Sequence, residues 1–251
     1  MSKDAIGDRF KNNYEGPARH LLTHRTPVVV RIDGRAFHTF TRDFCKPFDR
    51  KLIDMMVLSA IHVFTEMQGC KMAFIQSDEA SFILTDYDSF DTQPWFAYNK
   101  SKVESVAASC MTAAFARCQR LAGGRYEHAL ATFDARAFNV PENEVVNYFV
   151  WLAKDWARNS LSMYCQSIFS HHELHGKNSK AMHEMLFAKG RNWTLDLCND
   201  EKNGTFLISP ASAVATNSDI KPNYSEIAAV WEAVRPKEAA ETVETAATVS
   251  E

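Results

Sequence analysis

No stretch of the 251-residue chain approaches the roughly 18 consecutive apolar residues that a membrane span requires. The first ten residues, MSKDAIGDRF, also lack the apolar segment of a secretory signal. The net charge of −3 is too small for the whole surface to attract nucleic acid, so a polyanion would have to meet a local basic patch. These absences predict a cytoplasmic protein.

The six cysteines never form a Cys-x-x-Cys pair, so the spacing typical of zinc sites is absent. Most of them lie inside apolar segments, where a reduced thiol packs as a small hydrophobic side chain. This usage favours a reducing compartment. The chain shows no internal repeat, and its 46% hydrophobic and 24% charged residues are typical of a soluble globular protein.

Apolar periodicity predicts an alternation of strands and helices in the first 140 residues. The expected order, β-α-β-β-α-β, is that of the ferredoxin-like fold, an antiparallel sheet with two helices on one side. The expected elements are a strand at 27–34, a helix at 49–67, strands at 73–75 and 81–84, a helix at 98–121 and a strand at 128–138.

The second half of the chain has a different pattern. Helices are expected at 142–170 and 179–189, and the remainder ends in a small-residue acidic run with little to bury. The fold class is therefore α+β. We expect a ferredoxin-like βαββαβ domain at 1–140, a mainly helical extension at 141–220, and a loosely ordered tail at 221–251.

The turn expected between the second and third strands contains no glycine. Tight hairpins favour Asn-Gly, Asp-Gly or Gly-Gly, whereas AFIQSDEASFIL places Gln76, Ser77, Asp78 and Glu79 there. In this fold the end of the first strand, at Asp33, lies beside that hairpin. Two carboxylates at one sheet edge can bridge a pair of hard cations and leave positions open for phosphate. We therefore predict a metal site at Asp33 and Asp78.

The residues after Asp33 suit a phosphate ligand. Gly34 permits close approach of the backbone, so its carbonyl is a candidate metal ligand, and the amides of 35–38 can turn toward a triphosphate. Two metals that clamp a triphosphate on a βαββαβ sheet are the arrangement of polymerase palms. Taken separately, Asp-Gly after a strand and a Ser-Asp-Glu hairpin are more often simple solvated turns.

The segments RIDGRAFHTF (31–40) and QSDEASF (76–82) resemble the two signature blocks of the tRNA-His guanylyltransferase family, the reverse-direction (3′-to-5′) nucleotide polymerases. The similarity extends from about residue 26 to about residue 190. FCKPFD (44–49) and SKV (101–103) support it. The resemblance implies a palm-type nucleotidyltransferase that acts on tRNA and assembles as a homotetramer.

The resemblance also assigns roles to individual residues. It implies two magnesium ions at Asp33, the Gly34 carbonyl and Asp78, with Glu79 as a further catalytic candidate. It implies that an activating nucleotide, ATP, places its triphosphate against basic residues, and that GTP contacts the two signature blocks. The activating-nucleotide set is Lys46, Asp49 and Lys102, and the GTP set is Asp33, Gly34, Arg35, Ala36, Phe37, His38, Ser77 and Asp78.

Two departures from eukaryotic members bear on the substrate. Phe48 stands where those enzymes carry asparagine, within the pocket implied for the second nucleotide. Of their His-Ile-Asn-Asn-Leu-Tyr-Asn run, associated with choosing tRNA-His, the stretch 157–163 keeps only Asn159 and Leu161. The chain is similar in this respect to the guanylyltransferase-like proteins of bacteria, archaea and phages, which implies template-dependent repair of tRNA 5′ ends.

Contacts with tRNA are a weaker hypothesis, resting on Arg31, Asn159, Lys177 and Lys180. Three other functions stay open. A dedicated tRNA-His guanylyltransferase would add a single G at position −1. A palm-type nucleotide cyclase would turn over ATP or GTP without RNA. A binding module would have lost turnover, which the retention of both aspartates disfavours.

Overall fold

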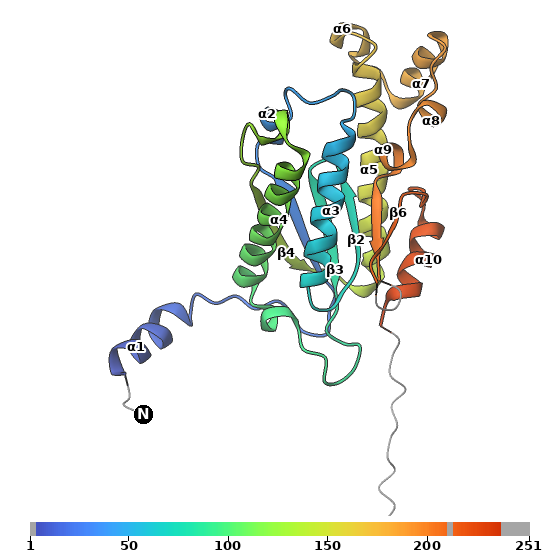
Figure 1. Ribbon diagram of the computed structural model, residues 1–251. Helices are drawn as coiled ribbons and strands as arrows, with labels where there is room; N and C mark the ends of the chain where they lie inside the picture. Colours follow the sequence, from blue (N-terminus) through green and yellow to red (C-terminus); the bar gives the residue numbers. More distant parts are fainter. Residues whose placement is uncertain (1–3, 210–212, 237–251) are drawn as a thin grey trace, which may run out of the picture.

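The structure is a computed structural model that describes residues 4–209 and 213–236. Its centre is a six-stranded antiparallel sheet with the order β4-β1-β3-β2-β5-β6 (Figure 1). The strands are β1 Val28–Gly34, β2 Cys70–Gln76, β3 Glu79–Leu84, β4 Phe133–Asn139, β5 Thr205–Ile208 and β6 Ala215–Asn217.

Helices cover both faces of this sheet. On one face α3 (Arg50–Glu66) and α4 (Lys100–Ala122) pack over Val28, Val30 and Ile32. On the other face α5 (Val145–Gln166) and α10 (Tyr224–Val234) pack over β-strand residues that include Val29, Met72 and Phe74. Because β1 is buried on both faces, it begins with a continuous apolar run at 28–30 rather than an alternating pattern.

Shorter elements connect these layers and extend beyond them. They are α1 Ala5–Phe10, a π-helix at Lys11–Glu15, α2 Phe37–Phe40, 3-10 turns at Trp95–Tyr98, Gly124–Glu127 and Glu142–Glu144, α6 His171–Leu174, α7 Ser179–Ala188, α8 Trp193–Asp196 and α9 Asn199–Asn203. A small third core, which includes Tyr164, Phe169 and Leu186, joins the end of α5 to α7.

The predicted α+β palm is confirmed, with the order β1-α3-β2-β3-α4-β4. Local signals set its element boundaries: α3 begins at the N-cap Asp49, and the chain turns back at Gly69. Gly69 has φ 79°, and a Cβ there would lie 2.2 Å from the Thr85 carbonyl oxygen, so only glycine fits. The strand expected at 128–138 begins only at Phe133, and an irregular segment separates it from a 3-10 turn at 124–127.

The C-terminal part departs most from expectation. The expected helix at 142–170 is helical only from Val145 to Gln166, and the mainly helical extension also contributes β5 and β6 to the sheet. The expectation of a loose tail from residue 221 is wrong for 224–234, which form α10. That helix is stable because Ile227, Trp231 and Val234 bury one face against α5 and the sheet.

The rest of the expected tail, 237–251, lies outside the described residues. The domain boundaries at 140 and 220 stay a prediction, although β5 hydrogen-bonds directly to β2. All six cysteines are free thiols. Among the described residues, none of the helices combines the length and the apolar character needed to cross a membrane.

Candidate active site

The β2–β3 hairpin brings the two predicted aspartates to one edge of the sheet. Gln76 pairs with Glu79, so Ser77 and Asp78 alone form the turn. Asp33 pairs with Glu79 across β1 and β3, and the Gly34 amide donates to the Asp78 carbonyl oxygen at 3.0 Å. Ser77 adopts φ 49°, the left-handed conformation that tight hairpins require, without being glycine.

Position 34 must be glycine because an aromatic ring lies against its backbone. A Cβ at this position would lie 2.3 Å from the ring of Phe37, which is buried against Phe40, Phe115 and Phe133. The close approach predicted for this glycine is therefore an approach to an aromatic side chain. Phe37 then begins α2, whose first amides have no side-chain acceptor at the N-cap, because Ala36 carries only a methyl group.

Burial dominates the electrostatics of the hairpin. It raises the pKa of Asp78 by more than the hydrogen bonds from Ser77 and from the Asp78 backbone lower it, and the charge of Asp33 adds a smaller increase. Burial also raises the pKa of Glu79 by more than its ion pair with Arg31 lowers it. A bound cation would relieve this repulsion between carboxylates. Glu79 is thus held by Arg31, which in turn lies over the ring of Trp151 at 5.7 Å.

An apolar pocket of about 410 Å³ opens beside the hairpin, within the size range of small-ligand sites. Its wall includes Phe48 and Trp156, whose rings meet edge-on with their centroids 6.2 Å apart. Of the residues predicted from the sequence to contact nucleotides, six line it: Phe37, His38, Lys46, Asp49, Ser77 and Asp78.

A second pocket, of about 350 Å³ and more polar, lies on the other side of the turn. Asp33, Asp78, Glu79 and Asn159 line it, and Ser77 and Asp78 line both pockets. The sequence did not indicate three further lining residues from α5. These are Asp155, Ser162 and Gln166, which share a helix face with Asn159 and form a polar stripe along it.

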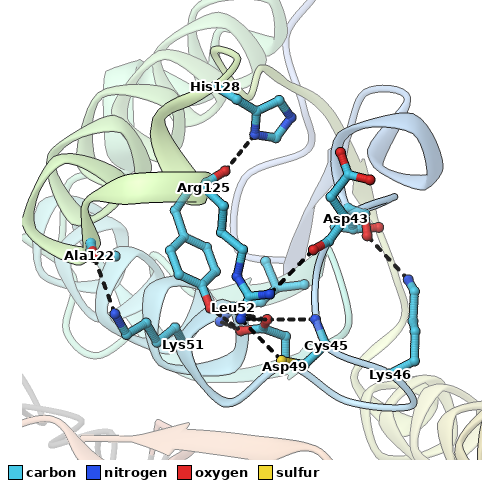
Figure 2. Close-up of polar contacts among 11 residues, drawn as sticks. Asp43, Cys45, Lys46, Asp49, Lys51, Leu52, Ala122, Arg125 and His128 are labelled. Carbon is cyan, nitrogen blue, oxygen red and sulfur yellow. Dashed lines mark hydrogen bonds and ion pairs between the residues drawn. The ribbon is translucent and has the colours of Figure 1, made fainter.

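Asp49 has a structural task (Figure 2). Its carboxylate accepts the amides of Cys45 at 2.9 Å and Leu52 at 3.1 Å, and the hydroxyl of Tyr126 at 3.1 Å. Burial alone would raise its pKa, but these donors and Arg125 outweigh burial and hold the pKa below its usual value. Asp49 therefore fixes the loop that forms the pocket wall, and its contact with a nucleotide stays a prediction.

The structure does not bring all the predicted residues together. Lys102 lies in the first turn of α4, about 30 Å of helix away from Ala122, whose carbonyl oxygen accepts from Lys51 near the pocket. Lys177 and Lys180 lie around the start of α7, and neither lines either pocket. Of the two tryptophans in α5, Trp156 is buried and Trp151 is half exposed.

The donor set suits a hard cation. Asp33 and Asp78 offer carboxylate oxygens at one sheet edge, and both line the polar pocket. In the part of the chain that the structure describes, no group of three or more His, Cys, Asp or Glu residues could hold a metal on its own. Magnesium there would need further oxygens, such as those of a substrate triphosphate, which is how this ion is usually bound.

Comparison with known proteins points to one family. A family model described as tRNAHis guanylyltransferase matches residues 8–141. A probable tRNA(His) guanylyltransferase of Dictyostelium discoideum is 31% identical over 194 residues, which cover 72% of this chain and 73% of the relative. The tRNA(His) guanylyltransferase of Schizosaccharomyces pombe is 30% identical over 189 residues, 70% of each chain.

Two solved structures agree with this. A bacterial tRNA(His) guanylyltransferase-like protein in complex with ATP is 38% identical, with a TM-score of 0.86 over 92% of this chain and 100% of that one. A complex of such a protein with GTP is 34% identical, with a TM-score of 0.77 over the same shares. The Saccharomyces cerevisiae enzyme, at 23% identity and a TM-score of 0.68, shares the fold.

Proposed function

We propose, on the premise that this chain belongs to the tRNA-His guanylyltransferase family and is a nucleotidyltransferase, that it adds nucleotides to the 5′ end of tRNA in the 3′-to-5′ direction. The observation that carries the proposal is the convergence of Asp33 and Asp78 at one sheet edge, between an apolar and a polar pocket. An acidic edge with a ligand-sized cavity on each side suits phosphoryl transfer.

The proposed roles follow from position. Asp33 and Asp78, with the Gly34 carbonyl, would hold two magnesium ions on the phosphates of the bound nucleotide. When bound, these ions lower the pKa of the attacking 3′-hydroxyl and neutralise the leaving phosphates. The amides at the start of α2 would orient the triphosphate. The turn at Ser77, which lines both pockets, would let groups bound in either pocket approach the triphosphate.

The apolar pocket would hold the nucleotide base. Phe48 and Trp156 supply the aromatic wall that base stacking uses, and Lys46 lies at the same pocket for a phosphate. Lys102, about 30 Å of helix away from the pocket end of α4, is too distant to contact a nucleotide in this pocket of its own chain. Two relatives of known structure bind ATP and GTP, which supports ATP or GTP as the nucleotide that activates the 5′ end.

We further propose that addition is templated and serves tRNA repair. The α5 run at 157–163, which departs from the eukaryotic sequence, contributes Asn159, Ser162 and Met163 to the polar pocket beside the acids. A pocket without the family's selective run would accept several tRNAs. Base pairing to the 3′ strand would then choose the nucleotide, because only a paired base places its 3′-hydroxyl in line with the activated phosphate.

The deciding experiment supplies tRNA-His and two other tRNAs, each lacking its first nucleotide, with magnesium, ATP and each nucleoside triphosphate in turn. We expect addition to every tRNA, with the base complementary to the 3′ strand, and no addition without RNA. Untemplated addition of G to full-length tRNA-His alone would favour the dedicated enzyme. Turnover of ATP or GTP to a cyclic product without RNA would favour a cyclase.

A further inference from the structure

A third cavity, of about 450 Å³, lies on the other side of α2 from the apolar pocket. Residues 37, 38 and 41 face the apolar pocket, whereas 36, 39 and 40 line this cavity, so the short helix forms a wall between the two. The first residue that lines the cavity, Arg35, follows Asp33 and Gly34 directly in the sequence. Its amide donates to the carbonyl oxygen of Thr132, another lining residue, at 2.8 Å. We call this cavity the basic groove.

The basic groove carries an excess of positive charge. Arg35 and Arg42 are both exposed and line it, and neither forms an ion pair with another residue of the described chain. Asp43 is the acidic residue of the lining. Arg125 donates to the backbone carbonyl oxygen of Asp43, at 3.4 Å, and not to its carboxylate (Figure 2). The two guanidinium groups outnumber the one carboxylate, so the groove has an excess of positive charge beside the acids.

A flat surface completes the basic groove. The ring of His128 stacks on that of Phe40, with the centroids 5.5 Å apart and the planes within 15°. The His128 Nδ1 lies 2.6 Å from the Arg125 carbonyl oxygen, so Nδ1 carries the proton and donates it there, which leaves Nε2 free (Figure 2). Leu130 beside it is largely exposed. Cations beside stacked rings and an apolar side chain are the elements of single-strand grooves.

We propose that the basic groove binds the phosphates of the tRNA strand that leads to the reacting 5′ end, a role that rests on the proposed function. A chain with a net charge of −3 can hold a polyanion only through a local concentration of cations, and this one directly adjoins Asp33 and Gly34. Guanidinium groups hold such phosphates by charge-assisted hydrogen bonds, and the His128 face offers a surface for one base.

The test measures binding of a 5′-truncated tRNA, without nucleotides, over a range of salt concentrations. Arg42→Ala should weaken binding and lower the salt slope by about one, and the Arg35→Ala, Arg42→Ala double variant by about two. His128→Ala should weaken binding with a smaller change in slope, because the proposed contact of this ring is with a base and not with a phosphate. Circular dichroism checks that each variant is folded.

Arg235→Ala is the matched control, since it removes the same charge from an exposed side chain just after α10, and it should leave binding and slope unchanged. If the groove holds the triphosphate of a nucleotide instead, Arg42→Ala weakens ATP or GTP binding and leaves tRNA binding intact, which overturns the proposal. Wild-type affinity and slope in the double variant overturn it as well.

The two proposals fail separately. A wild-type protein that binds tRNA with the expected dependence on Arg35 and Arg42, yet adds no nucleotide, would refute the proposed function and support the basic groove. A protein that extends tRNA 5′ ends while the double variant binds like wild type would support the function and refute the groove.

Discussion

Asp33 and Asp78 reach their positions through the backbone, since strand pairing and the Gly34 amide fix the main chain around them. Their side-chain oxygens are therefore not needed to hold the fold. The raised pKa of Asp78, caused chiefly by burial with a smaller contribution from the charge of Asp33, indicates that the folded chain bears a cost for keeping the Asp78 carboxylate ionised. A residue kept at such a cost is a strong functional candidate.

Replacing either aspartate should therefore separate activity from stability. We expect Asp33→Asn or Asp78→Asn to lower nucleotide addition by about three orders of magnitude, roughly 4 kcal/mol of transition-state stabilisation, without lowering the melting temperature. Asp134→Asn is the control: Asp134 pairs with Asp33 in the sheet but is exposed and lines neither pocket beside the hairpin. Near wild-type addition by Asp33→Asn or Asp78→Asn would refute the two-metal assignment.

At the scale of elements, α3 depends on its N-cap. The pKa of Asp49 is lowered in the folded chain, so its carboxylate stabilises the fold at pH values above the usual Asp pKa and loses that contribution as the pH falls toward the lowered value. We expect Asp49→Asn to reduce the free energy of unfolding by about 1–3 kcal/mol at neutral pH, because the amide cannot accept all the donors.

The difference between wild type and Asp49→Asn should shrink in acid, as followed by urea unfolding at several pH values. Asp54→Asn is a suitable control, since Asp54 is about half exposed and pairs with Arg50 on the surface. Its effect should stay within about 0.5 kcal/mol at every pH. A pH-independent loss in Asp49→Asn would mean that its charge does not stabilise the loop.

The C-terminal helix α10 is the second element with a clear test. Trp231 is buried against α5 and the sheet, and truncating it leaves a large cavity. Trp231→Ala should cost about 3–5 kcal/mol in the free energy of unfolding. Tyr224→Ala, at the exposed start of the same helix, should cost far less, and equal losses in the two variants would indicate that α10 does not pack as described.

The elements that were predicted correctly carry their signals locally. The β-branched run of β1, the helical spacing of α3 and α4 and the polar turn at Ser77 are visible within short windows, and they yield the palm and its acidic edge. The strand β5 has only four residues, Thr205–Ile208, and its partner in β2 is far away in the sequence. The polar stripe of α5 becomes a pocket wall only because the helix packs across the hairpin.

At the scale of the whole molecule, large apolar side chains remain exposed, including Phe90, Leu121, Phe187 and Leu195. Surfaces of this kind are typical of interfaces when they gather into patches. A homotetramer stays our prediction, and light scattering at about micromolar concentration should give a mass above that of one chain. Leu121→Asp or Phe187→Asp should then lower the mass, whereas a monomeric wild type would refute the prediction.

The position of β5 in the sheet has a consequence for the nascent chain during translation. Residues Met72–Ile75 of β2 pair with Thr205–Ile208 of β5, and Thr205 follows Ile75 by 130 residues. At about 5–20 residues per second, a ribosome delivers β5 roughly ten seconds after β2. Throughout that interval an apolar strand edge has no partner from its own chain, and such edges readily pair with other chains. The cell must therefore keep this nascent chain from its neighbours until β5, in the last fifth of the sequence, has been translated.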